Sequence, residues 1–232
     1  PAVDSAQAVL SGLAPDGGLY MPGAIPAFDW QHCLALSAQQ MSAAILSALL
    51  PDIPNMDALV KRAYTGKFET EDLTPTVPVG DFQVLELFRG PTSAFKDVAL
   101  SMLPQLLTAA KQKKGIAQEI RILTATSGDT GKAALVGFQD VPGVSICVFY
   151  PFGGVSQVQR AQMVTQEGEN VHVCAVEGNF DDAQTGVKNI FAACQGKELP
   201  FRLSSANSIN IGRLAPQIMY YFRAYREMLD SG

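Results

Sequence analysis

Residues 119–135 read EIRILTATSGDTGKAAL, and this stretch decides the fold. Its first half is rich in apolar and β-branched residues, which is typical of a buried strand. A short loop with two glycines follows, and the stretch then continues into a helix-like segment. Segments of these two kinds alternate along the rest of the chain. Apolar strands separated by helices predict an α/β fold, in which a parallel sheet carries helices on both faces.

The alternation extends outward from this stretch, from residue 77 to the end of the chain. Strands are predicted at 82–88, 119–126, 144–151, 171–178 and 201–205, and helices at 93–114, 130–139, 155–166, 180–194 and 209–229. Ligands of such sheets bind beyond the carboxyl ends of the strands. The loops that follow the strands are therefore expected to hold the functional residues.

The first part of the chain has a different pattern. Helices are predicted at 5–13, 37–50 and 55–64, and the proline-rich segment TPTVPVG at 74–80 is typical of a connector. We therefore predict two parts, a small and mainly helical subdomain at 1–76 and an α/β region at 77–232.

The composition argues against several classes of protein. Hydrophobic residues make up 47% of the chain and charged residues 17%, which argues against a disordered tail or a coiled coil. The net charge of -5 argues against non-specific nucleic-acid binding, because such binding needs a basic face. No apolar run approaches the roughly 18 residues that span a bilayer, and no secretory leader is visible. We expect a cytoplasmic protein without membrane contact.

The cysteines and histidines give no metal-binding pattern. Cys33, Cys147, Cys174 and Cys194 are far apart and form no CxxC pair, so we expect reduced thiols, buried at 147 and 174 where they lie in apolar strand-like runs. The two histidines have no neighbouring ligand residues, and no metal site is predicted.

The first informative loop is GPTSAFKDVAL at 90–100, directly after a predicted strand. Thr92 or Ser93 is expected to cap the following helix, which places Lys96 in its first turn. The positive end of the helix dipole disfavours a cation there. Lys96 is therefore a candidate amine nucleophile. The alternative is an ordinary solvated lysine.

The second informative loop is TATSGDTGKAAL at 124–135. Its small residues allow backbone N–H groups to approach an anion at the start of a helix. The loop is not a nucleotide P-loop, because only two residues separate Gly128 from Gly131 and Ala133 stands where serine or threonine is required. An oxyanion cradle fits better, and a tight structural turn is the alternative.

The third informative loop is SANSINIGRLAPQ at 205–217. Asn207, Ser208 and Asn210 supply hydrogen-bond groups at the start of a helix, and Arg213 adds a guanidinium about one turn later. Such a group suits a phosphate. The alternative is an ordinary helix cap, with Arg213 paired to a surface carboxylate.

Together and in this order, the segments PTSAFKD, TSGDTG and NSINIGR resemble threonine synthases, which are fold-type-II pyridoxal-phosphate enzymes with a fold like that of the tryptophan synthase β subunit. The segments APDGGLYMP at 14–22, FYPFGGVSQVQRAQM at 149–163 and GNFDDAQTGVKNIF at 178–191 also resemble that family. The resemblance covers nearly the whole chain, and the combination of three loops is far more specific than any one of them.

The resemblance implies a cofactor and the residues that bind it. Lys96 corresponds to the lysine that holds pyridoxal 5'-phosphate as an internal aldimine, which makes Lys96 the catalytic residue. Phe95 is expected to pack near the cofactor ring. Asp129 is expected near the 3-oxygen of the cofactor, where many other fold-type-II enzymes carry asparagine.

The resemblance also implies a substrate, O-phospho-L-homoserine, which reacts with water to give L-threonine and phosphate in threonine biosynthesis. The residues expected to contact its carboxylate come from the second loop: Thr126, Ser127, Asp129 and Thr130. The residues expected to hold its phosphate come from the third: Asn207, Ser208 and Arg213.

One element of the family pattern is missing from this sequence. The glycine-rich loop for the cofactor's own phosphate lies downstream of NSINIGR in the family, and no such loop follows Arg213 here. We therefore expect the 232-residue chain alone to be inactive and to bind the cofactor weakly. Two alternatives remain open: another fold-type-II lyase, of the threonine dehydratase or cysteine synthase type, and a non-catalytic relative that binds a phosphorylated metabolite. The sequence carries no signal for oligomeric state.

Overall fold

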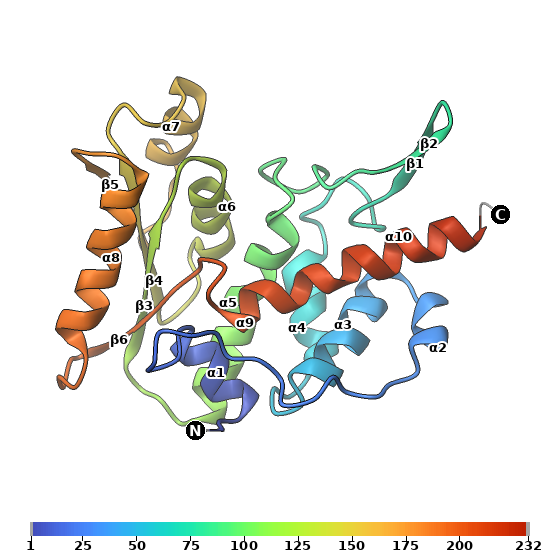
Figure 1. The fold of residues 1–232 in the computed structure, drawn as a ribbon, viewed down its shortest axis with the longest axis horizontal. Helices are drawn as coiled ribbons and strands as arrows, with labels where there is room; N and C mark the ends of the chain where they lie inside the picture. The colour runs from blue at the N-terminus through green and yellow to red at the C-terminus, as the bar shows by residue number, and fades with distance from the viewer. Residues whose placement is uncertain (1, 231–232) are drawn as a thin grey trace.

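A computed structural model describes residues 2–230 of the chain (Figure 1). Its centre is a four-stranded parallel sheet with the strand order β5-β4-β3-β6. The strands are β3 (Glu119–Ala125), β4 (Val144–Pro151), β5 (Val171–Val176) and β6 (Phe201–Ser204). The parallel sheet predicted from the stretch at 119–135 is thereby confirmed, and that stretch supplies one of its two central strands.

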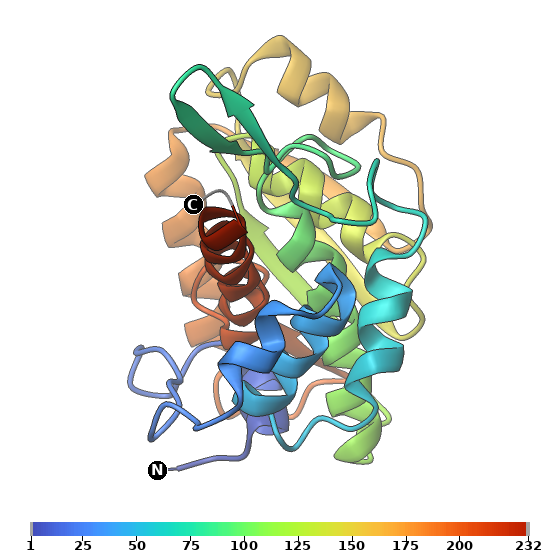
Figure 2. The same ribbon diagram turned by 90° about the vertical axis from the view of Figure 1, so that its right-hand side faces the viewer.

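Helices cover both faces of the sheet (Figures 1 and 2). One face carries α8 (Phe180–Cys194), and the other carries α5 (Asp97–Lys113) and α6 (Asp129–Phe138), with α7 (Gln157–Val164) packed beside α6. Because β3 and β4 are covered on both sides, most of their residues are apolar, and the charged residues of β3, Glu119 and Arg121, lie near its start. The α5 segment is buried along most of its length and packs against α6, α1, α4 and α9.

The N-terminal part is helical, as its pattern predicts. Three of its helices match the predicted segments to within two residues: α1 (Ser5–Ser11), α3 (Ala38–Leu49) and α4 (Met56–Tyr64). A fourth, α2 (Trp30–Leu34), lies outside the predicted helices. Ser37 caps α3 through a capping box with Gln40, and Asp4 caps α1 by accepting from the N–H of Gln7. Buried residues of this part and of the α/β region join in one hydrophobic core. The division into 1–76 and 77–232 stays a prediction.

The strand predicted at 82–88 belongs to a separate hairpin and not to the parallel sheet. The segment β2 (Phe82–Leu85) pairs with β1 (Thr76–Val79) in an antiparallel two-stranded sheet. The reason is the turn between them: Gly80 has a φ of 59° and is followed by Asp81, which gives a two-residue hairpin loop. The proline-rich connector is therefore partly a strand.

Two predicted helices differ from the structure by more than two residues at one end or by a break. The helix α5 begins at Asp97 and not at 93, because Ser93 has a φ of 55° and lies in a turn. The single helix predicted at 209–229 is three segments, α9 (Ile211–Leu214), the 3-10 turn η1 (Ala215–Ile218) and α10 (Met219–Asp230). Pro216 interrupts it, because proline has no N–H and its ring displaces the preceding turn.

The cysteine prediction is wrong at one position. All four cysteines are free, and Cys33 is buried, but Cys174 is exposed. Cys174 lies on β5, an edge strand, whereas Cys147 lies on the more central β4 and is partly buried. Within residues 2–230, the structure contains no helix that is both long and apolar enough to cross a membrane.

Candidate functional site

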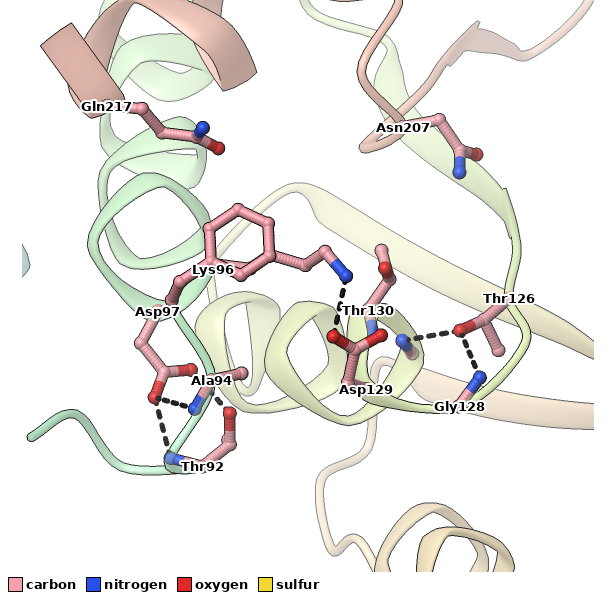
Figure 3. Close-up of polar contacts among 12 residues, drawn as sticks. Thr92, Ala94, Lys96, Asp97, Thr126, Gly128, Asp129, Thr130, Asn207 and Gln217 are labelled. Carbon is pink, nitrogen blue, oxygen red and sulfur yellow. Dashed lines mark hydrogen bonds and ion pairs between the residues drawn. The ribbon is translucent and has the colours of Figure 1, made fainter. Parts of the chain in front are cut away.

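The Lys96 amine and the Asp129 carboxylate form the centre of the site (Figure 3). Lys96 immediately precedes α5, and Asp129 opens α6, which follows the carboxyl end of β3 after the short loop 126–128. Lys96 Nζ lies 2.6 Å from Asp129 Oδ2, and 4.9 Å from the ring centroid of Phe95. The carboxyl ends of parallel strands are where ligands of this architecture bind. Two of the three informative loops therefore meet at the expected place.

The electrostatics of this pair follow from its position. The side chain of Lys96 is 17% exposed and that of Asp129 is 47% exposed. Burial alone would raise the pKa of Asp129, but the hydrogen bond and the positive charge of Lys96 outweigh it, so the pKa lies below its ordinary value. Asp129 is therefore an anion that holds the Lys96 amine in place.

The TSGDTG loop is organised around the hydroxyl of Thr126. Thr126 is buried, and its Oγ1 accepts hydrogen bonds from the N–H groups of Gly128, at 3.0 Å, and Gly131, at 2.9 Å. Gly128 has a φ of 148°, and a Cβ there would overlap the side chain of Gln159. Ser127 is exposed beside this turn. The loop thus presents the start of α6 to the site with little room for larger side chains.

The third loop reaches the same edge of the sheet from β6. Asn207 Nδ2 donates to the carbonyl oxygen of Ala125, the last residue of β3, at 3.1 Å. Asn210 is buried and caps α9 by accepting from the N–H of Gly212. Ser208 is exposed. In Figure 3, Asn207 and Gln217 lie on the far side of the Lys96 amine from Asp129.

Arg213 is a buried cation with an incomplete set of partners. It is 1% exposed, its Nη1 donates to Gln217 Oε1, and its Nε has no hydrogen-bond partner among the described residues. Burial lowers the pKa of Arg213 to about 10, and the negative charge of Asp129 opposes this. The guanidinium is therefore charged at neutral pH and close enough to Asp129 for their charges to interact. A buried, under-satisfied guanidinium is suited to an anion.

Three residues of the site were missed by the sequence analysis. Asp97 is buried and accepts from Thr92 N and Thr92 Oγ1, and so holds the turn before Lys96. Tyr220 donates from its hydroxyl to the carbonyl oxygen of Phe95, and Gln217 binds Arg213. Asp97 is the first residue of α5, and aspartate is favoured at the start of a helix, so the sequence did contain a signal for this residue. Gln217 stands four residues after Arg213, so helical spacing was an available signal for that pair. Tyr220 had no signal, because its partner lies 125 residues away in the sequence.

Known proteins resemble this chain along nearly its whole length. The family described as Threonine synthase N terminus matches residues 1–64. Threonine synthase of Pseudomonas aeruginosa is 40% identical over 231 residues, 97% of this chain and 48% of the relative. Threonine synthase of Eremothecium gossypii is 38% identical over 244 residues, 97% of this chain and 47% of the relative. The crystal structure of pyridoxal-phosphate-bound threonine synthase from Brucella melitensis matches with a TM-score of 0.86 at 38% identity, over 98% of this chain and 50% of that chain. The chain matches the N-terminal portion of threonine synthases.

The match to threonine synthases confirms the resemblance and the fold predicted from it. The match to each of these two relatives covers 97% of this chain, so it includes all three loops of the site. The chain spans about half the length of the curated threonine synthases that it matches.

Replacing Lys96 with alanine is expected to raise the pKa of Asp129. Without the amine, burial is the largest remaining influence, and burial favours the neutral carboxyl. In the parent, the pKa of Asp129 is lower in the folded protein than in the unfolded one. Asp129 therefore stabilises the fold at pH values above the unfolded pKa, and this contribution is lost as the pH falls through the folded pKa. The variant should lose this pH dependence. Carboxyl carbon NMR titration checks the shift, with Asp4, which pairs with Lys114, as the unchanged control. An unmoved Asp129 pKa would contradict the ion pair.

Proposed function

We propose that this chain is the N-terminal part of a threonine synthase that uses pyridoxal 5'-phosphate to convert O-phospho-L-homoserine and water into L-threonine and phosphate. The observation that carries the proposal is the convergence of Lys96, Asp129 and Arg213 from three distant loops at one edge of the sheet. The match to threonine synthases over nearly the whole chain supports it. The proposal assigns the catalytic role to Lys96.

The residues around Lys96 fit the proposed cofactor. The Lys96 side chain is 17% exposed, so an aldehyde can reach it while most of the side chain is shielded from bulk water. Phe95 is 41% exposed beside it and offers an aromatic surface for the pyridine ring. Asp129 supplies a carboxylate within hydrogen-bond distance of the amine, in the region proposed for the cofactor's 3-oxygen. When bound, pyridoxal phosphate supplies an electron sink that makes the carbon acids of the substrate accessible.

The proposed substrate contacts divide between the other two loops. The start of α6 provides N–H groups and hydroxyls for the substrate carboxylate, since a helix N-terminus favours an anion. The residues assigned there are Thr126, Ser127, Asp129 and Thr130. The buried Arg213 is proposed to bind the phosphate of the substrate, together with Asn207 and Ser208. A guanidinium whose Nε lacks a partner is suited to that task.

The chemistry proposed for these residues is proton transfer and charge stabilisation. The Lys96 amine, once free, is proposed to carry protons between neighbouring carbons of the substrate. Arg213 would hold the phosphate leaving group and stabilise the charge that it gains on departure. Asp129 would orient the amine, as it does in the ion pair.

Covalent labelling tests the proposal without requiring turnover, which suits a chain that spans about half of its relatives. The protein is incubated with pyridoxal phosphate, reduced with borohydride and mapped by mass spectrometry. We expect the pyridoxyl label to be concentrated on Lys96, at a level well above that of exposed lysines such as Lys61 and Lys188. Lys96→Ala should remove the selective label and leave the background on the other lysines. Equal labelling of Lys96 and the exposed lysines would overturn the proposal.

A further inference from the structure

The turn that carries Lys96 is fixed on one side by Asp97. The Asp97 carboxylate is 2% exposed and accepts from Thr92 N at 2.8 Å, Thr92 Oγ1 at 2.5 Å and Ala94 N at 3.4 Å. Gly90 allows this approach, because a Cβ there would lie 2.5 Å from the Cβ of Asp97. These bonds are local and fix the shape of the turn. They do not fix where the turn lies relative to the rest of the site.

Two long-range bonds supply that second constraint: the ion pair of the Lys96 side chain with Asp129, and a bond to the backbone of the turn itself. The hydroxyl of Tyr220, on α10, donates to the carbonyl oxygen of Phe95, which precedes α5 and is adjacent to Lys96. Tyr220 is 7% exposed, and burial raises the pKa of its hydroxyl well above the ordinary value, so the group stays protonated as a donor. The two partners are 125 residues apart in the sequence.

Tyr220 is also attached to the anion-binding side of the site. Its helix follows directly on the 3-10 turn that carries Gln217, which binds Arg213. The charge of Arg213 and the Tyr220 hydroxyl are close enough to influence one another. One side chain thus connects the segment that bears the guanidinium to the turn that bears the amine.

Building on the proposed function, we propose that Tyr220 is a positioning residue that sets the placement of the Lys96 amine relative to the anion-binding group of Arg213 and Asn207. A substrate with a reacting carbon near Lys96 and a phosphate near Arg213 needs both ends placed together. Small errors in such placement reduce reaction rates by large factors. Tyr220 is proposed to act through the Phe95 carbonyl.

The test compares Tyr220→Phe with Tyr221→Phe. Both substitutions remove one hydroxyl, but Tyr221 is 75% exposed and serves as the matched control. In the labelling experiment, we expect the ratio of pyridoxyl label on Lys96 to that on Lys61 to fall about tenfold in Tyr220→Phe. Tyr221→Phe should keep the parent ratio. Ile120→Val, in the core at the opposite end of β3, controls for a general loss of stability.

Hydrogen exchange provides a second measurement, whose result would not change if Tyr220 had only a structural role. Inorganic phosphate, bound at Arg213, is expected to slow exchange of the Thr92 and Ala94 amides in the parent and in Tyr221→Phe. Tyr220→Phe should lose this response to phosphate, whatever its basal exchange. If Tyr220→Phe fails to fold, the deciding measurement is the slowing of amide exchange by phosphate in the parent. The absence of that slowing would overturn the inference.

The outcomes separate this inference from the proposed function. Unselective labelling in the parent would overturn the proposed function and this inference with it. Selective labelling that persists in Tyr220→Phe would overturn the inference alone. An equal fall in Ile120→Val would reduce Tyr220 to a contributor to general stability, which also overturns it.

Discussion

Replacing Gly137 with alanine is expected to lower the free energy of unfolding by about 3 kcal/mol or more. Gly137 lies on α6 where that helix crosses α5, and a Cβ there would lie 2.8 Å from the carbonyl carbon of Leu100 and overlap its oxygen. The obstacle is backbone, so no rotation of a side chain relieves it, and the two helices have to separate. The gain in helix propensity from alanine, about 1 kcal/mol, is too small to compensate.

The same substitution should also disturb the site. Lys96 lies one turn before Leu100, and Asp129 lies two turns before Gly137, so the close crossing of α5 and α6 brings the amine and the carboxylate together. Chemical denaturation measures the loss of stability, and the pKa of Asp129 should rise in any Gly137→Ala protein that folds. Gly186→Ala is the control, because Gly186 lies on the exposed side of α8 with nothing near a new Cβ. It should be neutral or stabilising by up to ~1 kcal/mol. Equal stability of the two variants would contradict the crossing geometry.

The sequence predicts the sheet well because its signal is local. The apolar runs of β3 and β4 follow from burial on both faces, and the helices after them follow from periodicity. Local signals also locate the turns that bear Lys96 and Asp129. The strand predicted at 82–88 pairs in the hairpin and not in the parallel sheet, because its partner is set by the hairpin turn at Gly80 and not by the strand itself.

The remaining features of the site depend on contacts between distant segments. Tyr220 reaches the carbonyl oxygen of Phe95, which lies 125 residues earlier in the sequence. No periodic pattern contains such information. The role of Gly137 is hidden for the same reason, since a glycine in a helix has no recognisable purpose until its neighbour on another helix is known.

Arg213→Met is expected to stabilise the protein and to abolish phosphate binding. Arg213 is 1% exposed, forms no ion pair among the described residues and leaves its Nε without a partner. Replacing such a buried charge with an apolar side chain of similar volume is expected to raise the free energy of unfolding by about 1–3 kcal/mol. The same change removes the proposed phosphate ligand and should weaken phosphate binding by about 100-fold.

The two effects of Arg213→Met can be measured in one series of thermal unfolding curves. A ligand that binds only the folded state raises the unfolding temperature with its concentration. The parent should therefore be stabilised by phosphate relative to chloride at equal ionic strength, whereas Arg213→Met should start higher and show no response. Arg202→Met, at an exposed arginine on β6, should keep the parent's response. A destabilised Arg213→Met protein that still responds to phosphate would show that Arg213 is a structural residue and that the anion binds elsewhere. We expect Arg213→Met to be more stable than the parent without phosphate and to gain no stability when phosphate is added. This is the result expected if the buried charge of Arg213 is retained for binding.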